Sequence, residues 1–151
     1  MPQNTSPIYT LTPKIGRASW VAATTANTTN GGVGTIGTNM LLCYTAGANG
    51  AFINKVRLHP VGLTAATATT ATVGRVYIST VASGATTNAD TQLYAEVACP
   101  AQTTAQTTTA TSYIEIPFGI AIAANETILF SMHHAAAANT GWDISVIAGD
   151  Y

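Results

Sequence analysis

Residues 51–80 read AFINKVRLHPVGLTAATATTATVGRVYIST, and this stretch decides the fold class. Two apolar segments, 51–61 and 73–81, flank a run of alanine and threonine, and the two segments contain three of the chain's five basic residues. A patterned strand followed by a loop of small residues recurs along the whole chain. The recurrence predicts an all-β protein, a sandwich whose loops carry little charge.

Apolar and polar residues alternate along both of these segments, as expected for strands with one buried face. The expected inward residues are Phe52, Val56 and Leu58 in the first segment and Val76 and Ile78 in the second, opposite Lys55, Arg57, His59, Arg75 and Tyr77.

Six further segments have strand patterns, which makes eight strands: 17–24, 38–45, 91–98, 111–118, 126–133 and 141–148. In 91–98 we expect Leu93, Ala95 and Val97 to share one face. Most connections exceed the two to five residues that hairpins favour. We therefore predict a single-domain, eight-stranded antiparallel β-sandwich of jelly-roll type. Alternating strand directions then gather loops 25–37, 62–72, 99–110 and 134–140 at one end, opposite both termini.

The first 16 residues contain three prolines, which fix φ and remove donors, so we expect an extended arm over 1–16 and a sandwich domain over 17–151. The arm's apolar residues Ile8, Tyr9, Leu11 and Ile15 indicate that it lies against its own domain or a neighbour. The arm has neither a basic segment nor an apolar run that would make an export signal, and no stretch of the chain is long and apolar enough to cross a membrane.

The charge content is low, since charged residues make up 7% of the chain and the formal net charge is −1. A field this weak argues against binding to nucleic acid or an anionic membrane. A surface with little charge also favours association, so we expect a homo-oligomer. Cys43 lies in an apolar strand, and we expect Cys43 and Cys99 to be unpaired.

Motifs for catalysis are weak, and the sequence predicts neither an enzyme nor a bound cofactor or metal. Residues 32–37 spell GxGxxG, but a strand rather than a helix follows, so the stretch is interpreted as a loop. His133 and His134 are adjacent and would point to opposite faces, which leaves a metal on a symmetry axis as the alternative. The acids near strands lack an aromatic-lined cleft for glycoside hydrolysis; they are Glu96, Glu115, Glu126 and Asp143.

One basic group stands out on the outward faces of the two opening segments: Lys55, Arg57, His59 and Arg75. It could contact an acidic protein surface, or it could be a solvated face bridged to Glu96 or Glu115. A second group could stack on sugars or could fill the core and interfaces; it comprises Trp20, Trp142, Tyr77, Tyr94 and Tyr113.

Four stretches, YTLTPKIGRASW, NGAFINKVRLHPVG, VGRVYIST and GWDISVIAGDY, resemble the small Ala/Thr/Gly-rich β-sandwich proteins of tailed-bacteriophage virions. The resemblance implies a non-enzymatic, often trimeric structural subunit of the particle, assembled in the host cytoplasm. It would be a capsid decoration (cement) protein or a tail or baseplate component, and its partner the major capsid protein or another virion protein. The expected interface residues are Ile8, Tyr9, Leu11, Ile15, Lys55, Arg57 and Arg75.

Two other interpretations stay open at the level of sequence. A glycan- or receptor-binding module would carry its ligand at the loop end, with Trp142 as the stacking residue. A secreted adhesin of the host would need an export signal encoded upstream.

Overall fold

The computed structural model describes residues 12–63, 68–104 and 110–151, and these form strands and no helix. Eight strands are long and two, β2 and β6, contain two residues each, so the predicted all-β class is confirmed. The strands are β1 (Thr12–Val21), β2 (Gly34–Thr35), β3 (Leu41–Thr45), β4 (Ala51–Gly62), β5 (Thr72–Ser79), β6 (Ala85–Thr86), β7 (Thr91–Cys99), β8 (Ile114–Ile122), β9 (Thr127–Met132) and β10 (Thr140–Asp150).

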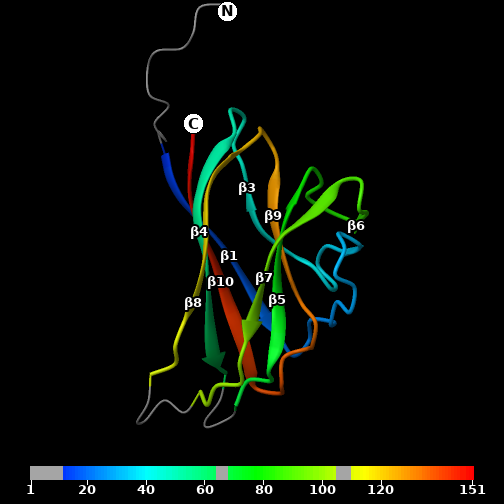
Figure 1. Ribbon diagram of the computed structural model, residues 1–151, viewed down its shortest axis with the longest axis vertical. Coiled ribbons are helices and arrows are strands. Elements are labelled where there is room, and N and C mark those ends of the chain that lie inside the picture. The colour runs from blue at the N-terminus through cyan, green and yellow to red at the C-terminus, as the bar shows by residue number, and fades with distance from the viewer. Residues whose placement is uncertain (1–11, 64–67, 105–109) are drawn as a thin grey trace, which may run out of the picture.

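The eight long strands form two four-stranded sheets, ordered β1-β10-β4-β8 and β3-β9-β5-β7, and every neighbouring pair is antiparallel. Successive long strands alternate between the sheets, except that β5 leads to its neighbour β7. This is the order of a jelly roll, in which the chain wraps two sheets around one core. Figure 1 shows the two layers with the open side between β7 and β8 toward the viewer.

The core lies between the sheets and consists of the inward residues of the alternating strands. Val56, Leu58, Val76 and Trp142 are each at most 1% exposed, as the alternation predicts. The core is completed by side chains from five other strands, β1, β3, β7, β8 and β9, and by further residues of β4 and β10; among them are Trp20, Cys43, Ile116, Phe118, Phe130 and Val146.

Two expected face assignments are wrong because bulges shift the pleat. A register shift between Ile53 and Lys55 turns Ile53 into the core and leaves Phe52 partly exposed on the other side. A second register shift lies in the pairing of β5 with β7, where Val76 is opposite Ala95 and Tyr77 is opposite Leu93. Tyr94 is therefore the extra residue of a bulge in β7. Leu93 therefore does not share the face of Ala95, and its side chain is 37% exposed.

Strand β1 begins at Thr12, five residues earlier than the sequence suggested, and it pairs with β10 from Thr12↔Asp150 onward. Residues 12–16 therefore belong to the sandwich instead of the arm. Pro13 is tolerated because β1 is an edge strand. Ile15 lies on β1 and is 58% exposed, whereas Ile8, Tyr9 and Leu11 lie outside the described residues.

Three of the four long loops gather at one end, as predicted. Loop 62–72 meets loop 99–110 through the bridge between Ala68 and Thr103, and it meets loop 134–140 through Leu63 N–H donating to the Asn139 carbonyl at 2.8 Å. Strand β1 begins and β10 ends at the opposite end (Figure 1).

The fourth loop, 25–37, does not stay at that end, which corrects the prediction. It runs over the outer face of the sheet β3-β9-β5-β7, where the Asn27 N–H donates to the Met132 carbonyl and β2 pairs with β6. The cause is a second apolar cluster on this face, formed by Met40, Tyr77 and Leu129, which the loop removes from water.

One side of the sandwich is closed by direct contact between the edge strands β1 and β3. A Cβ on Gly16 would overlap the Cys43 carbonyl oxygen and lie 2.8 Å from Tyr44 Cβ. Only glycine permits this approach of one edge to the other.

Gly16→Ala should lower the free energy of unfolding by about 2–3 kcal/mol, because the backbone of β3 must move to admit a methyl group. Chemical denaturation measures the change. Gly37→Ala is the matched control: its Cβ meets nothing within 4 Å, and its positive φ of 86° should cost about 1 kcal/mol. Equal losses for the two variants would contradict the close packing of β1 on β3.

Candidate interaction surface

The outer face of the sheet β1-β10-β4-β8 carries a charged cluster built across two strands. Arg57 on β4 lies opposite Glu115 on β8, and its Nη2 donates to Glu115 Oε1 at 2.6 Å. Lys55 Nζ donates to both carboxylate oxygens, at 3.0 and 3.1 Å. The Arg57 guanidinium also lies over the Tyr113 ring, 4.6 Å from its centroid. Hydrogen bonds from Arg57 and Lys55 lower the pKa of the Glu115 carboxyl.

This cluster is solvent exposed, with side-chain exposures of 30% for Lys55, 40% for Arg57 and 33% for Glu115. Two cations share one carboxylate, so the cluster keeps a net positive charge. Arginine and tyrosine are common in the centres of protein interfaces. A hollow of about 330 Å³ beside it is lined by Asn54, Lys55, Glu115 and Pro117. The arrangement can bind an acidic protein surface.

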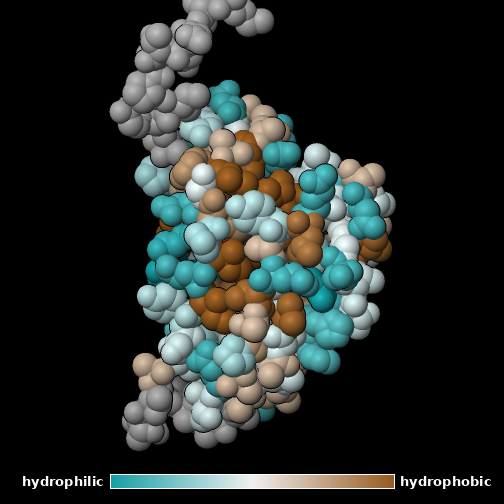
Figure 2. Space-filling model, in the orientation of Figure 1, coloured by the Kyte–Doolittle hydropathy of each residue, from teal (hydrophilic) through white to brown (hydrophobic). Residues whose placement is uncertain are grey.

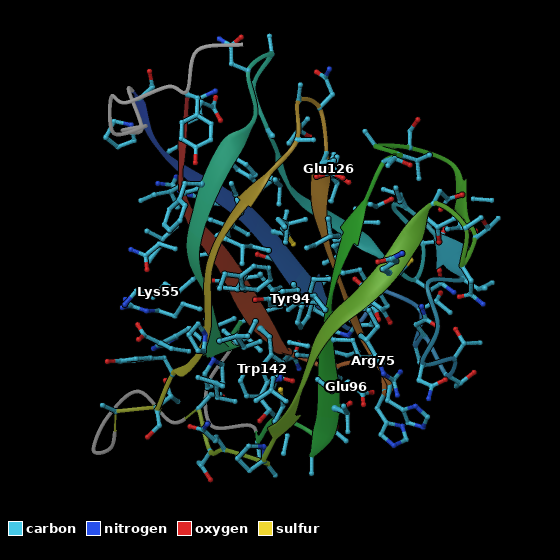
Figure 3. All side chains as sticks on the ribbon, turned by 45° about the horizontal axis from the view of Figure 1, so that its top comes forward. Lys55, Arg75, Tyr94, Glu96, Glu126 and Trp142 are labelled. Atoms are coloured by element: carbon cyan, nitrogen blue, oxygen red, sulfur yellow. The ribbon has the colours of Figure 1, made fainter. Side chains whose placement is uncertain are left out.

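Arg75 does not join this cluster, which corrects the expected basic constellation. It lies on β5 in the other sheet and is 6% exposed. Its Nε donates to Glu96 at 2.6 Å, and its Nη1 donates to the carbonyls of Asn27 at 3.0 Å and Thr29 at 2.9 Å. Figure 3 shows Arg75 and Glu96 together, far from Lys55. Arg75 thus holds the 25–37 loop against its sheet.

A half-buried ionic network, in which Asp150 is buried and Lys14 is exposed, joins β1 to β10 near the start of β1. Asp150 is 7% exposed; its Oδ2 pairs with Lys14 Nζ at 2.5 Å, and its Oδ1 accepts from the Tyr44 hydroxyl and from Gly47 N–H. Burial alone would raise the pKa of the Asp150 carboxyl, but the bonds from Lys14, Tyr44 and Gly47 outweigh it and lower the pKa. Burial, followed by the bond to Asp150, raises the pKa of Tyr44.

The aromatic residues do not form a sugar-stacking platform. Trp20, Trp142 and Tyr77 are at most 1% exposed, and Figure 3 places Trp142 inside the sandwich. Tyr94 is stacked on Phe118, with centroids 4.0 Å apart, and Tyr113 lies under Arg57. A glycan site built on Trp142 is therefore excluded by its burial.

The expected acids have structural partners. Glu96 and Glu115 accept from cations, Asp143 accepts from Ser19 Oγ at 2.6 Å, and Glu126 accepts from Ala123 N–H at 2.7 Å. Across the described ranges, no group of three or more histidine, cysteine, aspartate or glutamate side chains could hold a metal ion.

The structure also locates the histidine pair, the two cysteines and the GxGxxG stretch. His133 and His134 follow the end of β9, and their rings lie edge to face with centroids 4.9 Å apart, so the expectation that they point to opposite faces of a strand is wrong. Cys43 and Cys99 are free and buried, as predicted, and burial raises the pKa of Cys99 to about 11. The GxGxxG stretch includes β2, where the 25–37 loop covers its sheet. None of the described residues belong to a helix that could span a membrane.

No protein-family model and no curated protein matches this chain. Among solved structures, the capsid asymmetric unit of cyanophage Pam1 aligns with 99% of this chain and 94% of the matched chain, at 15% identity and a TM-score of 0.40. These comparisons assign no role to any residue of this chain.

Arg75→Lys should lower the free energy of unfolding by about 2 kcal/mol, because an ammonium cannot span Glu96 and two carbonyls as the guanidinium does. Chemical denaturation measures this loss, and hydrogen exchange should show faster exchange of the Asn27 amide. Arg57→Lys, on the exposed face, should change stability by less than about 0.5 kcal/mol. A similar loss in both variants would refute the anchoring role of Arg75.

Asp150→Asn should lower the free energy of unfolding by about 2 kcal/mol at pH 7, through loss of the charged acceptor of Lys14 and Tyr44. The pKa of Asp150 is lower in the folded state, so its stabilisation is complete above the unfolded value of about 3.9 and disappears as pH falls through the folded value. Denaturation curves at pH 7 and pH 2.5 should therefore show the variant and the wild type converging in acid. Asp143→Asn, on the exposed face, is the control, and a gap as large at pH 2.5 as at pH 7 would contradict the ionic role.

Proposed function

We propose that this chain is a non-enzymatic structural protein of a bacteriophage virion, a decoration (cement) protein that binds the assembled head through protein contacts. The observation that carries the proposal is the jelly-roll strand order, an architecture used by viral capsid and lectin domains. The lectin alternative loses its expected stacking residue because Trp142 is buried.

The two ends of the molecule support distinct roles. The long loops that meet near Ala68 and Thr103 contain small uncharged residues, which suit a solvent-facing tip. The arm leaves the opposite end, where β1 starts at Thr12. In this proposal the arm end and the exposed cluster of Lys55, Arg57 and Tyr113 face the particle.

The two outer sheet faces also differ. The face of β3-β9-β5-β7 is covered by the chain's own 25–37 loop, which Arg75 fixes in place. The face of β1-β10-β4-β8 keeps Arg57 and Tyr113 exposed, at 40% for the Arg57 side chain and 54% for Tyr113. An exposed face with arginine and tyrosine suits a partner surface that carries acidic groups.

Copy number in purified virions tests the proposal, measured by quantitative mass spectrometry against the major capsid protein. A decoration protein should be present at a copy number comparable with that of the capsid protein. A copy number of only a few per particle would favour the tail or baseplate alternative, and absence from virions would overturn the proposal. Particles that lack the protein should still form heads but should lose their DNA at a lower temperature.

Lys55→Ala/Arg57→Ala should reduce occupancy on such particles, with the apparent affinity falling about tenfold, equivalent to ~1.4 kcal/mol. The ion pairs are exposed, so the fold should be retained. Val33→Ala is the control, because Val33 is 45% exposed in the loop that covers the other sheet. Unchanged occupancy of the double variant would remove this face from the proposal without affecting the copy-number test.

A further inference from the structure

The two sides of the sandwich differ in how they close. On the β1/β3 side, Trp20, Cys43 and Tyr44 are at most 5% exposed, and Gly16 packs on the backbone of β3. On the other side, no backbone pairing joins β7 to β8 within the described residues, and each of these strands pairs on one edge only. The Tyr94 ring stacks on Phe118 there, and its hydroxyl donates to the Phe118 carbonyl at 3.3 Å.

The open side is an apolar seam. Figure 2 shows hydrophobic side chains gathered along the middle of this face, where Figure 1 places β8 and β7. Ile114 and Ile120 of β8 and Ala95 and Val97 of β7 are only partly buried against the core. Beside the seam, at the arm end of β7, a cleft of about 230 Å³ is lined by residues of β5, β7 and the turn before β9, among them Ile78, Leu93, Tyr94 and Glu126, and by none of β8.

We propose that this seam, between β7 and β8, binds residues 1–11 of a second copy of the chain. An extended segment can hydrogen-bond to an unpaired strand edge while its apolar side chains fill the gap between the sheets. The segment 1–11 has no charged side chain, and three of its last four residues are Ile8, Tyr9 and Leu11. Its polypeptide continues directly into β1 at the same end of the sandwich as the cleft.

The occupant comes from another copy because the chain's own apolar residues are too close to β1. The β1 strand is three strand spacings from β8 in the sheet β1-β10-β4-β8, about 14 Å at ~4.8 Å per spacing. Extended chain covers ~3.3–3.6 Å per residue, so crossing the sheet takes at least four residues. Residues 8–11 would be used in that crossing, and only the polar stretch MPQNTSP would reach the seam of its own copy.

This geometry places the β1 side of one copy against the β7/β8 side of the next. Such a head-to-tail contact uses two different surfaces, and repeated copies form a ring where the rotation closes. Ile15, 58% exposed on β1 beside the arm, would extend the apolar contact. The inference concerns the purified chain and does not depend on the virion role.

Native mass spectrometry of the purified chain tests the proposal. The wild type should be an oligomer, whereas deletion of residues 2–11 and Leu93→Asp should each give a monomer that keeps the β-sheet circular dichroism spectrum of the wild type. Leu93 is 37% exposed, so the aspartate should not disturb the core. Val33→Asp, at a site 45% exposed in the 25–37 loop, is the control and should stay oligomeric.

Crosslinking identifies the occupant of the seam. Leu11→Cys chains mixed with Leu93→Cys chains, treated with a short bismaleimide, should give covalent dimers that contain one of each, and the native cysteines are buried at 4% and 1% exposure. A monomeric wild type, or an oligomer that survives both the deletion and Leu93→Asp, would overturn the proposal. A Leu11→Cys/Leu93→Cys double variant that crosslinks only within its own chain, while the mixed single variants give no covalent dimer, would also overturn it.

Discussion

The structure depends on one constraint, the burial of an apolar layer between two sheets, to which each of the eight long strands contributes its inward side chains. The inward residues of β4, β5, β9 and β10 are almost fully excluded from water, and Trp20 and Trp142 supply the largest side chains. Jelly-roll wrapping follows, because alternate strands must contribute to opposite walls of that layer. Every other feature, including the covering loop and the exposed face, is positioned relative to this layer.

Period-two alternation explains why the fold class and most inward residues could be predicted from the sequence. The errors occurred where tertiary contacts decide the register. The bulges at Asn54 and Tyr94 arise from pairing with neighbouring strands, and no local residue pattern predicts them. The early start of β1 was missed because Pro13 suggested an arm, although an edge strand accepts proline.

The path of the 25–37 loop did have a signal in the sequence. The stretch TILFSM of β9 is buried on both faces. Phe130 faces the core between the sheets, whereas Leu129 faces outward and must be covered by another segment of the chain. Tyr77 on β5 requires the same cover. The role of Arg75 could not be predicted, because its partners Asn27 and Thr29 are 48 and 46 residues away and contribute backbone carbonyls.

The chain has few charged residues, and its ion pairs differ in how far they are buried. The pairs Lys14–Asp150 and Arg75–Glu96 each have one buried partner, with side-chain exposures of 10% for Asp150 and 8% for Arg75, whereas the cluster around Glu115, which joins β4 to β8, is exposed on both strands. A buried pair is strongly destabilising to break, while an exposed pair contributes little to stability. The exposed cluster is therefore poorly explained by folding alone. Its position on the uncovered face, together with an apolar seam at β7/β8, favours a molecule completed by contacts with other chains.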